Sequence, residues 1–124
     1  PNNLLNYGYT VLRAAVARAL AGSGLLATLG IHHHNKYNAF CLADDVMEPY
    51  RPFVDGLVYG ISATNEDIDD LTTELKLKLL EILAVDVRFG DMTRPLMVGL
   101  STTTASLARC FAGKARKISY PEIF

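Results

Sequence analysis

The stretch NNLLNYGYTVLRAAVARALA, residues 2–21, decides the fold. Its apolar residues recur at steps of three and four with alanines between them, and this spacing predicts a well-buried helix from Asn2 to Ala21. Gly22 and Gly24 then end the helix. Because the chain has 124 residues and 50% of them are hydrophobic, it can bury one substantial core, and we expect a single domain built around this helix.

A polar cluster interrupts this first helix, formed by Asn6, Tyr7, Tyr9 and Arg13 around Gly8. Buried tyrosine hydroxyls and amides need hydrogen-bond partners, so this face either supports a site or contacts a ligand. Glycine costs about 1 kcal/mol relative to alanine inside a helix, which predicts close approach of another backbone at Gly8. Packing of a second helix against Gly8 is the simpler interpretation.

The rest of the chain predicts a mainly α fold, a helical bundle lobe with a short β-hairpin near 85–96. Proline beyond the first turn removes a backbone donor, so Pro49 and Pro52 predict a first-turn start or a kink in the second helix. The expected segments are a loop at 25–42, a helix from 43–45 to 58, a loop at 60–70, an amphipathic helix from 72 or 73 to 83, the hairpin, a helix from about 94 to 112–114, and an extended tail.

Candidate chemistry lies in GIHHHNKYNAFCLADDVMEPYRP, residues 30–52, where three histidines precede three carboxylates. At most two of these histidines can share a site in a short loop. His33 and Glu48 supply two of the three ligands of a minimal divalent site, whose oxygen-rich donors favour Mg²⁺ or Mn²⁺ over zinc. Asp45 and Glu48 share a helix face if the helix has begun by then. Alternatively, Asp44 and Asp45 cap the helix, and Glu48 is a solvated acid.

The charge pattern gives little guidance to a partner, because the formal net charge is −1. Residues 86–124 nevertheless hold six basic and three acidic side chains, which is either a solvated surface or a phosphate-binding face. No run of about 18 apolar residues predicts a membrane span, and the start of the chain lacks a secretory pattern. We therefore expect an intracellular protein with no membrane contact, in which Cys41 and Cys110 are reduced thiols.

Three blocks of this sequence together resemble a known family. They are NNLLNYGYTVLRAAVARAL (2–20), the stretch 30–52 quoted above, and DVRFGDMTRPLMVGLSTTTASLARCFAGKARKISYPEI (86–123). In order and spacing they are similar to the CRISPR-associated spacer-acquisition integrase, the metal-dependent endonuclease subunit of the adaptation complex. The central block looks most like the type II members, which accompany single-effector, dual-RNA-guided systems.

The resemblance implies roles for particular residues. The family places a metal-binding histidine after a glycine-apolar pair and a carboxylate fifteen positions later in a D-x-x-E-P-[FY]-R-P setting, and these fall on His33 and Glu48. Asp45 matches the aspartate of that setting, and we expect it, with Asp44 and Tyr9, to support the site. The family's remaining ligand is a glutamate on an earlier helix. Residues 1–124 are therefore expected to be the carboxy-terminal α-helical catalytic lobe, without the amino-terminal β-rich domain and the first ligand helix.

The implied activity is a single-site transesterification that joins captured DNA fragments into a CRISPR array, catalysed with Mg²⁺ or Mn²⁺. The implied partners are double-stranded DNA (the captured fragment and the repeat array), a second copy in a homodimer, and a small second CRISPR adaptation protein, in the bacterial cytoplasm. Arg13, Arg51, Arg109 and Lys114 are expected phosphate contacts. We expect the isolated 124-residue chain to be inactive or barely active.

Two other classes of function remain as alternatives. A non-catalytic helical dimerisation or interaction module would predict that His33→Ala leaves every activity of the complete protein unchanged. A metal phosphohydrolase acting on nucleotides would need a contiguous His-Asp pair and further histidines on later helices, and the sequence has neither.

Overall fold

The computed structural model describes residues 2–25, 41–64 and 71–122, and it confirms a mainly α fold with a short hairpin. Its elements in chain order are α1 (Asn2–Gly22), α2 (Cys41–Met47), the 3-10 turn η1 (Glu48–Tyr50), α3 (Arg51–Thr64), α4 (Thr73–Leu80), the 3-10 turn η2 (Glu81–Ala84), β1 (Asp86–Phe89), β2 (Met92–Pro95) and α5 (Leu96–Phe111). None of the helices in these ranges is long and apolar enough to cross a membrane.

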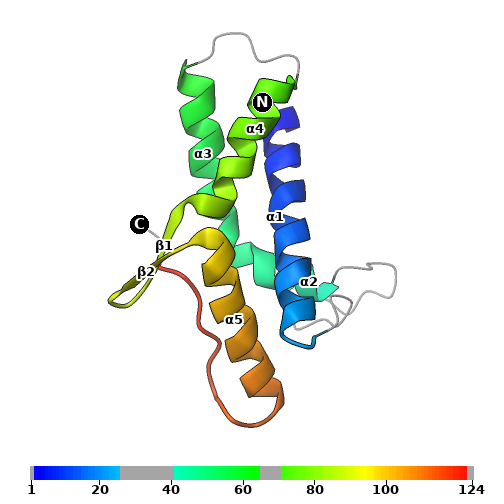
Figure 1. Ribbon diagram of the computed structural model, residues 1–124, viewed down its shortest axis with the longest axis vertical. Coiled ribbons are helices and arrows are strands. Elements are labelled where there is room, and N and C mark those ends of the chain that lie inside the picture. Colours follow the sequence, from blue (N-terminus) through cyan, green and yellow to red (C-terminus); the bar gives the residue numbers. More distant parts are fainter. Residues whose placement is uncertain (1, 26–40, 65–70, 123–124) are drawn as a thin grey trace.

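Helix α1 is the centre of the fold, as its spacing predicted. Leu4, Leu12, Val16 and Leu20 are fully buried, and α1 contacts α2, α3, α4 and α5. Figure 1 shows α3 and α4 beside the first half of α1 and α5 toward its far end. Ala15 and Ala19 are partly buried against the core, where small side chains let neighbouring helices approach, whereas Ala14 and Ala21 are exposed.

The predicted packing at Gly8 is confirmed. A Cβ atom built at Gly8 would lie 2.7 Å from Cγ1 of Val54, which is buried on α3. Two carbon atoms at rest are 3.5–4.0 Å apart, so only glycine allows α1 and α3 to approach this closely. This contact fixes the side chains next to Gly8 against the start of α3.

The predicted kink at the two prolines is also confirmed. Helix α2 stops at Met47, η1 carries Pro49 in its first turn, and α3 starts at Arg51 with Pro52 as its second residue. Prolines in first turns lose no intrahelical hydrogen bond, so the chain restarts its helix there. In Figure 1, α2 lies at a steep angle to α3.

The predicted start of α2 and the predicted end of α3 are wrong. Helix α2 begins at Cys41 rather than at 43–45, and Leu42 and Ala43 are already fully buried. Helix α3 continues to Thr64, whereas a loop was expected from residue 60. The reason is that Ile61 extends the buried row of Val54 and Val58 by a further turn. Most of the expected loop at 25–42 and residues 65–70 lie outside the described residues.

The hairpin and the chain after α5 form one connected unit. Strands β1 and β2 pair antiparallel with Val87 opposite Arg94, and Gly90 at the turn has a φ of +61°. Arg94 therefore belongs to β2, and α5 begins at Leu96 rather than at 94. Residues 115–122, which we term the strap, run back along α5, where the Ser119 amide donates to Ser106 Oγ at 2.7 Å. The Glu122 amide then donates to the carbonyl of Arg88 at 2.8 Å.

Hydroxyl groups of α5 form hydrogen bonds to η1 and to the end of α1. The hydroxyls of Tyr50 and Thr103 lie 2.6 Å apart, and those of Ser23 and Thr104 lie 2.9 Å apart. Both Tyr50 and Thr103 are fully buried, so their mutual hydrogen bond satisfies polar groups that burial would otherwise destabilise. Tyr50 thus holds the 3-10 turn, and with it the neighbouring Glu48, in a fixed place.

Candidate functional site

Glu48 is the first residue of η1, directly after the end of α2, and its side chain is 55% exposed. Its Oε1 lies 3.4 Å from Nε of Arg51, three positions later. The proline break therefore presents this carboxylate at the surface at the junction of two helices. This is a suitable position for a ligand that must reach a cation and substrate from solvent.

The two aspartates before Glu48 have different surroundings. Asp45 is 5% exposed. Burial raises the pKa of Tyr120 in the strap, and the negative charges of Asp45 and Cys110 raise it further. Asp44 pairs with Arg13 of α1, whose Nε lies 3.0 Å from Asp44 Oδ1. The sequence spacing predicted that Asp45 would share a face with Glu48, but one side chain is buried and the other is exposed.

Tyr9 joins α1 to the start of α3. Its hydroxyl donates a hydrogen bond to Asp55 Oδ1, and the guanidinium carbon of Arg51 lies 4.9 Å from the centre of its ring. The hydrogen bond to Asp55, burial and the charge of Asp55 raise the pKa of Tyr9, whereas Arg51 lowers it. Sequence analysis missed Asp55, although its position four residues after Arg51 on a predicted helix was a signal that the two share a face.

Two of the expected phosphate contacts therefore have partners within the protein. Arg13 pairs with Asp44, and Arg51 contacts both Glu48 and Tyr9. The side chain of Arg13 is 46% exposed and that of Arg51 is 31% exposed. These contacts place the candidate supporting residues Asp44 and Tyr9 and the candidate ligand Glu48 along one side of α1.

The described part of this site fits a hard divalent cation in the type of its donors but not in their number. Glu48 offers an exposed carboxylate, and carboxylate oxygens suit Mg²⁺ and Mn²⁺. Within residues 2–25, 41–64 and 71–122, no three histidine, cysteine, aspartate or glutamate side chains gather as a metal site. His33, the second predicted ligand, lies outside the described residues.

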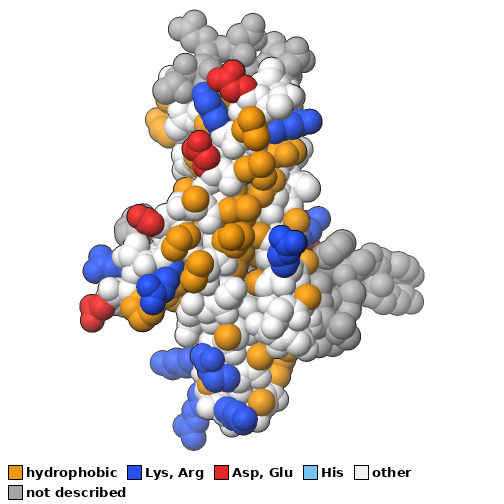
Figure 2. Space-filling view, viewed as in Figure 1, with side chains coloured by type: hydrophobic (Ala, Val, Ile, Leu, Met, Phe, Trp, Pro, Cys, Tyr) orange, Lys and Arg blue, Asp and Glu red, His pale blue; other side chains and the backbone are white. Residues whose placement is uncertain are grey.

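Arg109 and Lys114 are brought together by the end of α5. Gly113 has a φ of +74°, and the Lys114 amide donates to the carbonyl of Arg109 at 2.8 Å, as in a Schellman motif. Arg116 and Lys117 follow, and residues 109–117 contain no acidic side chain. All four cations are exposed, and Figure 2 shows Lys and Arg side chains gathered at this end of the molecule. We call this group the basic patch.

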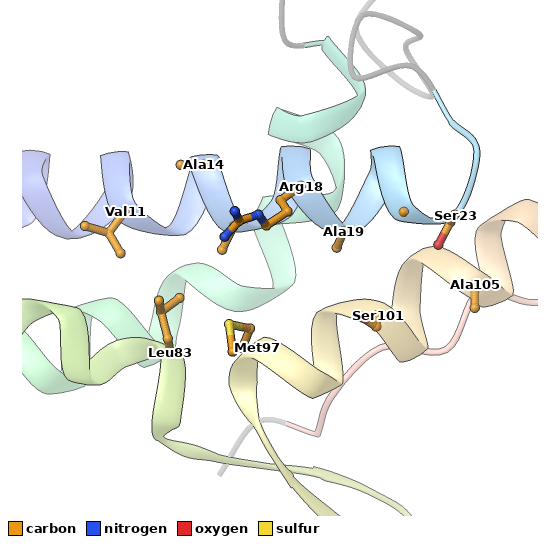
Figure 3. A pocket seen from close by; sticks show the side chains of 11 residues that line it. Val11, Ala14, Arg18, Ala19, Ser23, Leu83, Met97, Ser101 and Ala105 are labelled. Carbon is orange, nitrogen blue, oxygen red and sulfur yellow. The ribbon is translucent and has the colours of Figure 1, made fainter.

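A separate groove of about 520 Å³ lies between α1, η2 and α5 (Figure 3). Its walls include Val11, Ala15, Leu83, Met97 and Ala105, with Arg18 as its one charged side chain among the described residues. Among the residues that the structure describes, no carboxylate or histidine lines it. The groove therefore lacks the donors that a divalent cation requires, and the chemistry of Glu48 belongs elsewhere on the protein.

Comparison with known proteins identifies the family of this chain. A family model described as CRISPR associated protein Cas1 matches residues 1–80, which include α1, the kinked helix pair and α4. The chain belongs to the Cas1 family. The resemblance of residues 2–20 and 30–52 to the CRISPR-associated integrase family is confirmed by this match.

The chain is similar to part of two Cas1 proteins and to part of one solved structure. It is 34% identical over 98% of its length to "CRISPR-associated endonuclease Cas1" of Neisseria meningitidis, and 32% identical over 85% of its length to "CRISPR-associated endonuclease Cas1 2" of Pyrobaculum aerophilum. A structure named "Casposase bound to integration product" superposes on 95% of the chain with a TM-score of 0.79 and 25% identity. The chain spans 40%, 35% and 39% of these proteins, respectively.

Proposed function

We propose that this Cas1-family chain is the helical catalytic lobe of a metal-dependent DNA endonuclease and integrase that inserts captured fragments into a CRISPR array. The observation that carries the proposal is the similarity of 95% of the chain, at a TM-score of 0.79, to a casposase bound to an integration product. The exposed carboxylate of Glu48 at the helix break supports it. The whole activity would require the parts of the protein that this chain does not span.

In this proposal, Glu48 and His33 are two of the ligands that hold one Mg²⁺ or Mn²⁺ ion. The bound cation would supply Lewis-acid polarisation of the scissile phosphodiester. The remaining ligand would come from an earlier helix of the complete protein. Asp45 would act from inside the fold, because it is buried, by fixing the end of α2 that precedes Glu48.

The reaction would be a transesterification at a repeat boundary. A DNA 3′-hydroxyl oxygen forms a bond to phosphorus, the bond from phosphorus to the leaving 3′-oxygen breaks, and the proton passes from the attacking to the leaving oxygen. Double-stranded DNA is the proposed partner, and the basic patch, with four exposed cations and no acidic residue, is its proposed backbone contact. A homodimer and a small second adaptation protein would complete the assembly in the bacterial cytoplasm.

The test is Mn²⁺ binding and strand transfer by the complete protein with His33→Ala, Glu48→Ala and a matched control. Glu74→Ala is the control, because Glu74 is also an acid in the first turn of a helix, it is exposed, and it pairs weakly with Lys78 at 3.9 Å. We expect both site variants to lose Mn²⁺ binding and strand transfer while the control retains them. Equal Mn²⁺ binding by all four proteins would refute the site, and unchanged activity of His33→Ala would favour a non-catalytic interaction module.

A further inference from the structure

The side chain of Arg51 connects Tyr9 to the candidate ligand Glu48. Its guanidinium carbon lies 4.9 Å from the ring centre of Tyr9, and its Nε lies 3.4 Å from Oε1 of Glu48. The Tyr9 hydroxyl in turn donates a hydrogen bond to Asp55, one turn along α3 from Arg51. Four side chains from two helices and the 3-10 turn thus form a continuous row that ends at Glu48.

This row is better ordered than an ordinary surface ion pair. An exposed pair three residues apart gains little, because two flexible side chains must be held in one geometry. Here the guanidinium rests on an aromatic face, which restricts its orientation. The close approach of α1 to α3 at Gly8 holds the backbone next to Tyr9, and the hydrogen bond to Asp55 holds its hydroxyl.

The local backbone also places Glu48 over Arg51. In a 3-10 turn the side chains of residues i and i+3 eclipse one another. Glu48 is the first residue of η1, and Arg51, three positions later, directly follows the end of η1. The Nε atom of Arg51 is buried and has no hydrogen-bond partner among the residues that the structure describes. A buried donor needs an acceptor, and a small movement of the Glu48 side chain would bring Oε1 from 3.4 Å into hydrogen-bond range.

We infer that Arg51 is a positioning residue, held by Tyr9 and Asp55, that orients the Glu48 carboxylate for cation binding. This inference rests on the proposed function, in which Glu48 is a metal ligand. Because a carboxylate has two oxygens, the contact of Arg51 with Oε1 leaves Oε2 to bind the cation. Ligating carboxylates are commonly oriented by a neighbouring hydrogen-bond donor, and loss of such a donor costs metal affinity.

The inference is tested by Mn²⁺ titration of the complete protein, followed by electron paramagnetic resonance, which reports binding without turnover. Arg51→Lys keeps the positive charge but loses the planar stack, so we expect its Mn²⁺ affinity to fall about tenfold. We expect the Mn²⁺ affinity of Tyr9→Leu, which removes the supporting ring, to fall by a similar factor. Tyr9→Phe retains the ring and should recover most of the affinity. The double variant Arg51→Lys, Tyr9→Leu should bind no more weakly than the weaker single variant, because both changes disrupt one row.

Tyr7→Leu is the matched control. Tyr7 lies on the same helix and also has a cation over its ring, Lys76 at 5.9 Å, but that contact leads to α4 rather than to Glu48. We expect this variant to bind Mn²⁺ as the unaltered protein does. An equal loss in Tyr7→Leu would mean that any disturbance of α1 weakens the site, and would overturn the specific role of Tyr9.

Two outcomes separate this inference from the proposed function. If Glu48→Ala loses Mn²⁺ binding while Arg51→Lys and Tyr9→Leu bind normally, Glu48 is a ligand but Arg51 does not position it. If Arg51→Gln binds Mn²⁺ more tightly and Tyr9→Leu is unchanged, Arg51 acts only as a competing charge, and the inference is likewise overturned. If Glu48→Ala binds as the unaltered protein does, the proposed ligand fails and the role of Arg51 fails with it.

Discussion

Replacing Gly8 by alanine tests the packing that brings Tyr9 to the start of α3. The new Cβ would lie 2.7 Å from Cγ1 of Val54, about 1 Å inside the usual separation of two carbons. Val54 is buried, and a β-branched side chain in a helix has essentially one χ1 rotamer, so it cannot turn away. Overpacking of this kind costs about 1–3 kcal/mol, whereas alanine gains up to about 1 kcal/mol in helix propensity.

Gly56→Ala is the matched control, because a Cβ at Gly56 on α3 meets nothing within 4 Å. This variant should show the propensity gain alone. The difference between the two variants isolates the overpacking cost. We therefore expect the free energy of unfolding of Gly8→Ala to be about 2 kcal/mol lower than that of Gly56→Ala. Urea denaturation of the 124-residue chain, followed by circular dichroism, measures both values. Equal stabilities would show that α1 and α3 are not in close contact at Gly8.

Two further predictions concern pH and salt. Burial raises the pKa of Tyr50 well above 10, so the unfolded state loses this proton first as pH rises. The contribution of Tyr50 to the free energy of unfolding is therefore complete below pH 10, and above pH 10 it declines by at most about 1.4 kcal/mol per pH unit. In urea titrations at different pH values, Tyr50→Phe should show a smaller decline than the unaltered chain. An identical decline in the variant would contradict this. In DNA binding by the complete protein, Arg109→Gln and Lys114→Gln should each reduce the salt slope by about 0.9, and an unchanged slope would remove the basic patch from the interface.

The fold could be predicted where local patterns decide it. The spacing of apolar residues in 2–21 gave the central helix, Gly8 gave the close helix contact, and Pro49 and Pro52 gave the break before α3. Boundaries were less predictable, because they depend on tertiary burial. Ile61 extends α3 past the expected end because it packs into the core, and its three-residue step after Val58 was a signal that the prediction did not use.

Sequence analysis named candidate residues for the site but did not predict how their side chains pair. Glu48 is exposed at the break, as a cation ligand should be, but Arg13 and Arg51 contact Asp44 and Glu48, and Asp55 was not anticipated. Pairing between α1 and the α2 to α3 junction depends on how these helices cross, and sequence spacing determines only neighbours on the same helix. The role of His33 as a ligand stays a prediction.

The return of the strap to the hairpin has a consequence for local opening of the protein. Glu122 binds β1 through its backbone amide, and its carboxylate accepts a hydrogen bond from the Gly90 amide at 3.2 Å, so the last described residues are tied to a turn more than thirty positions earlier. The two ends of the segment 86–122 are thus hydrogen-bonded to each other, and we expect this segment to unfold locally in one cooperative step. Amide hydrogen exchange would then show the hairpin amides and the Ser119 amide with one shared opening free energy.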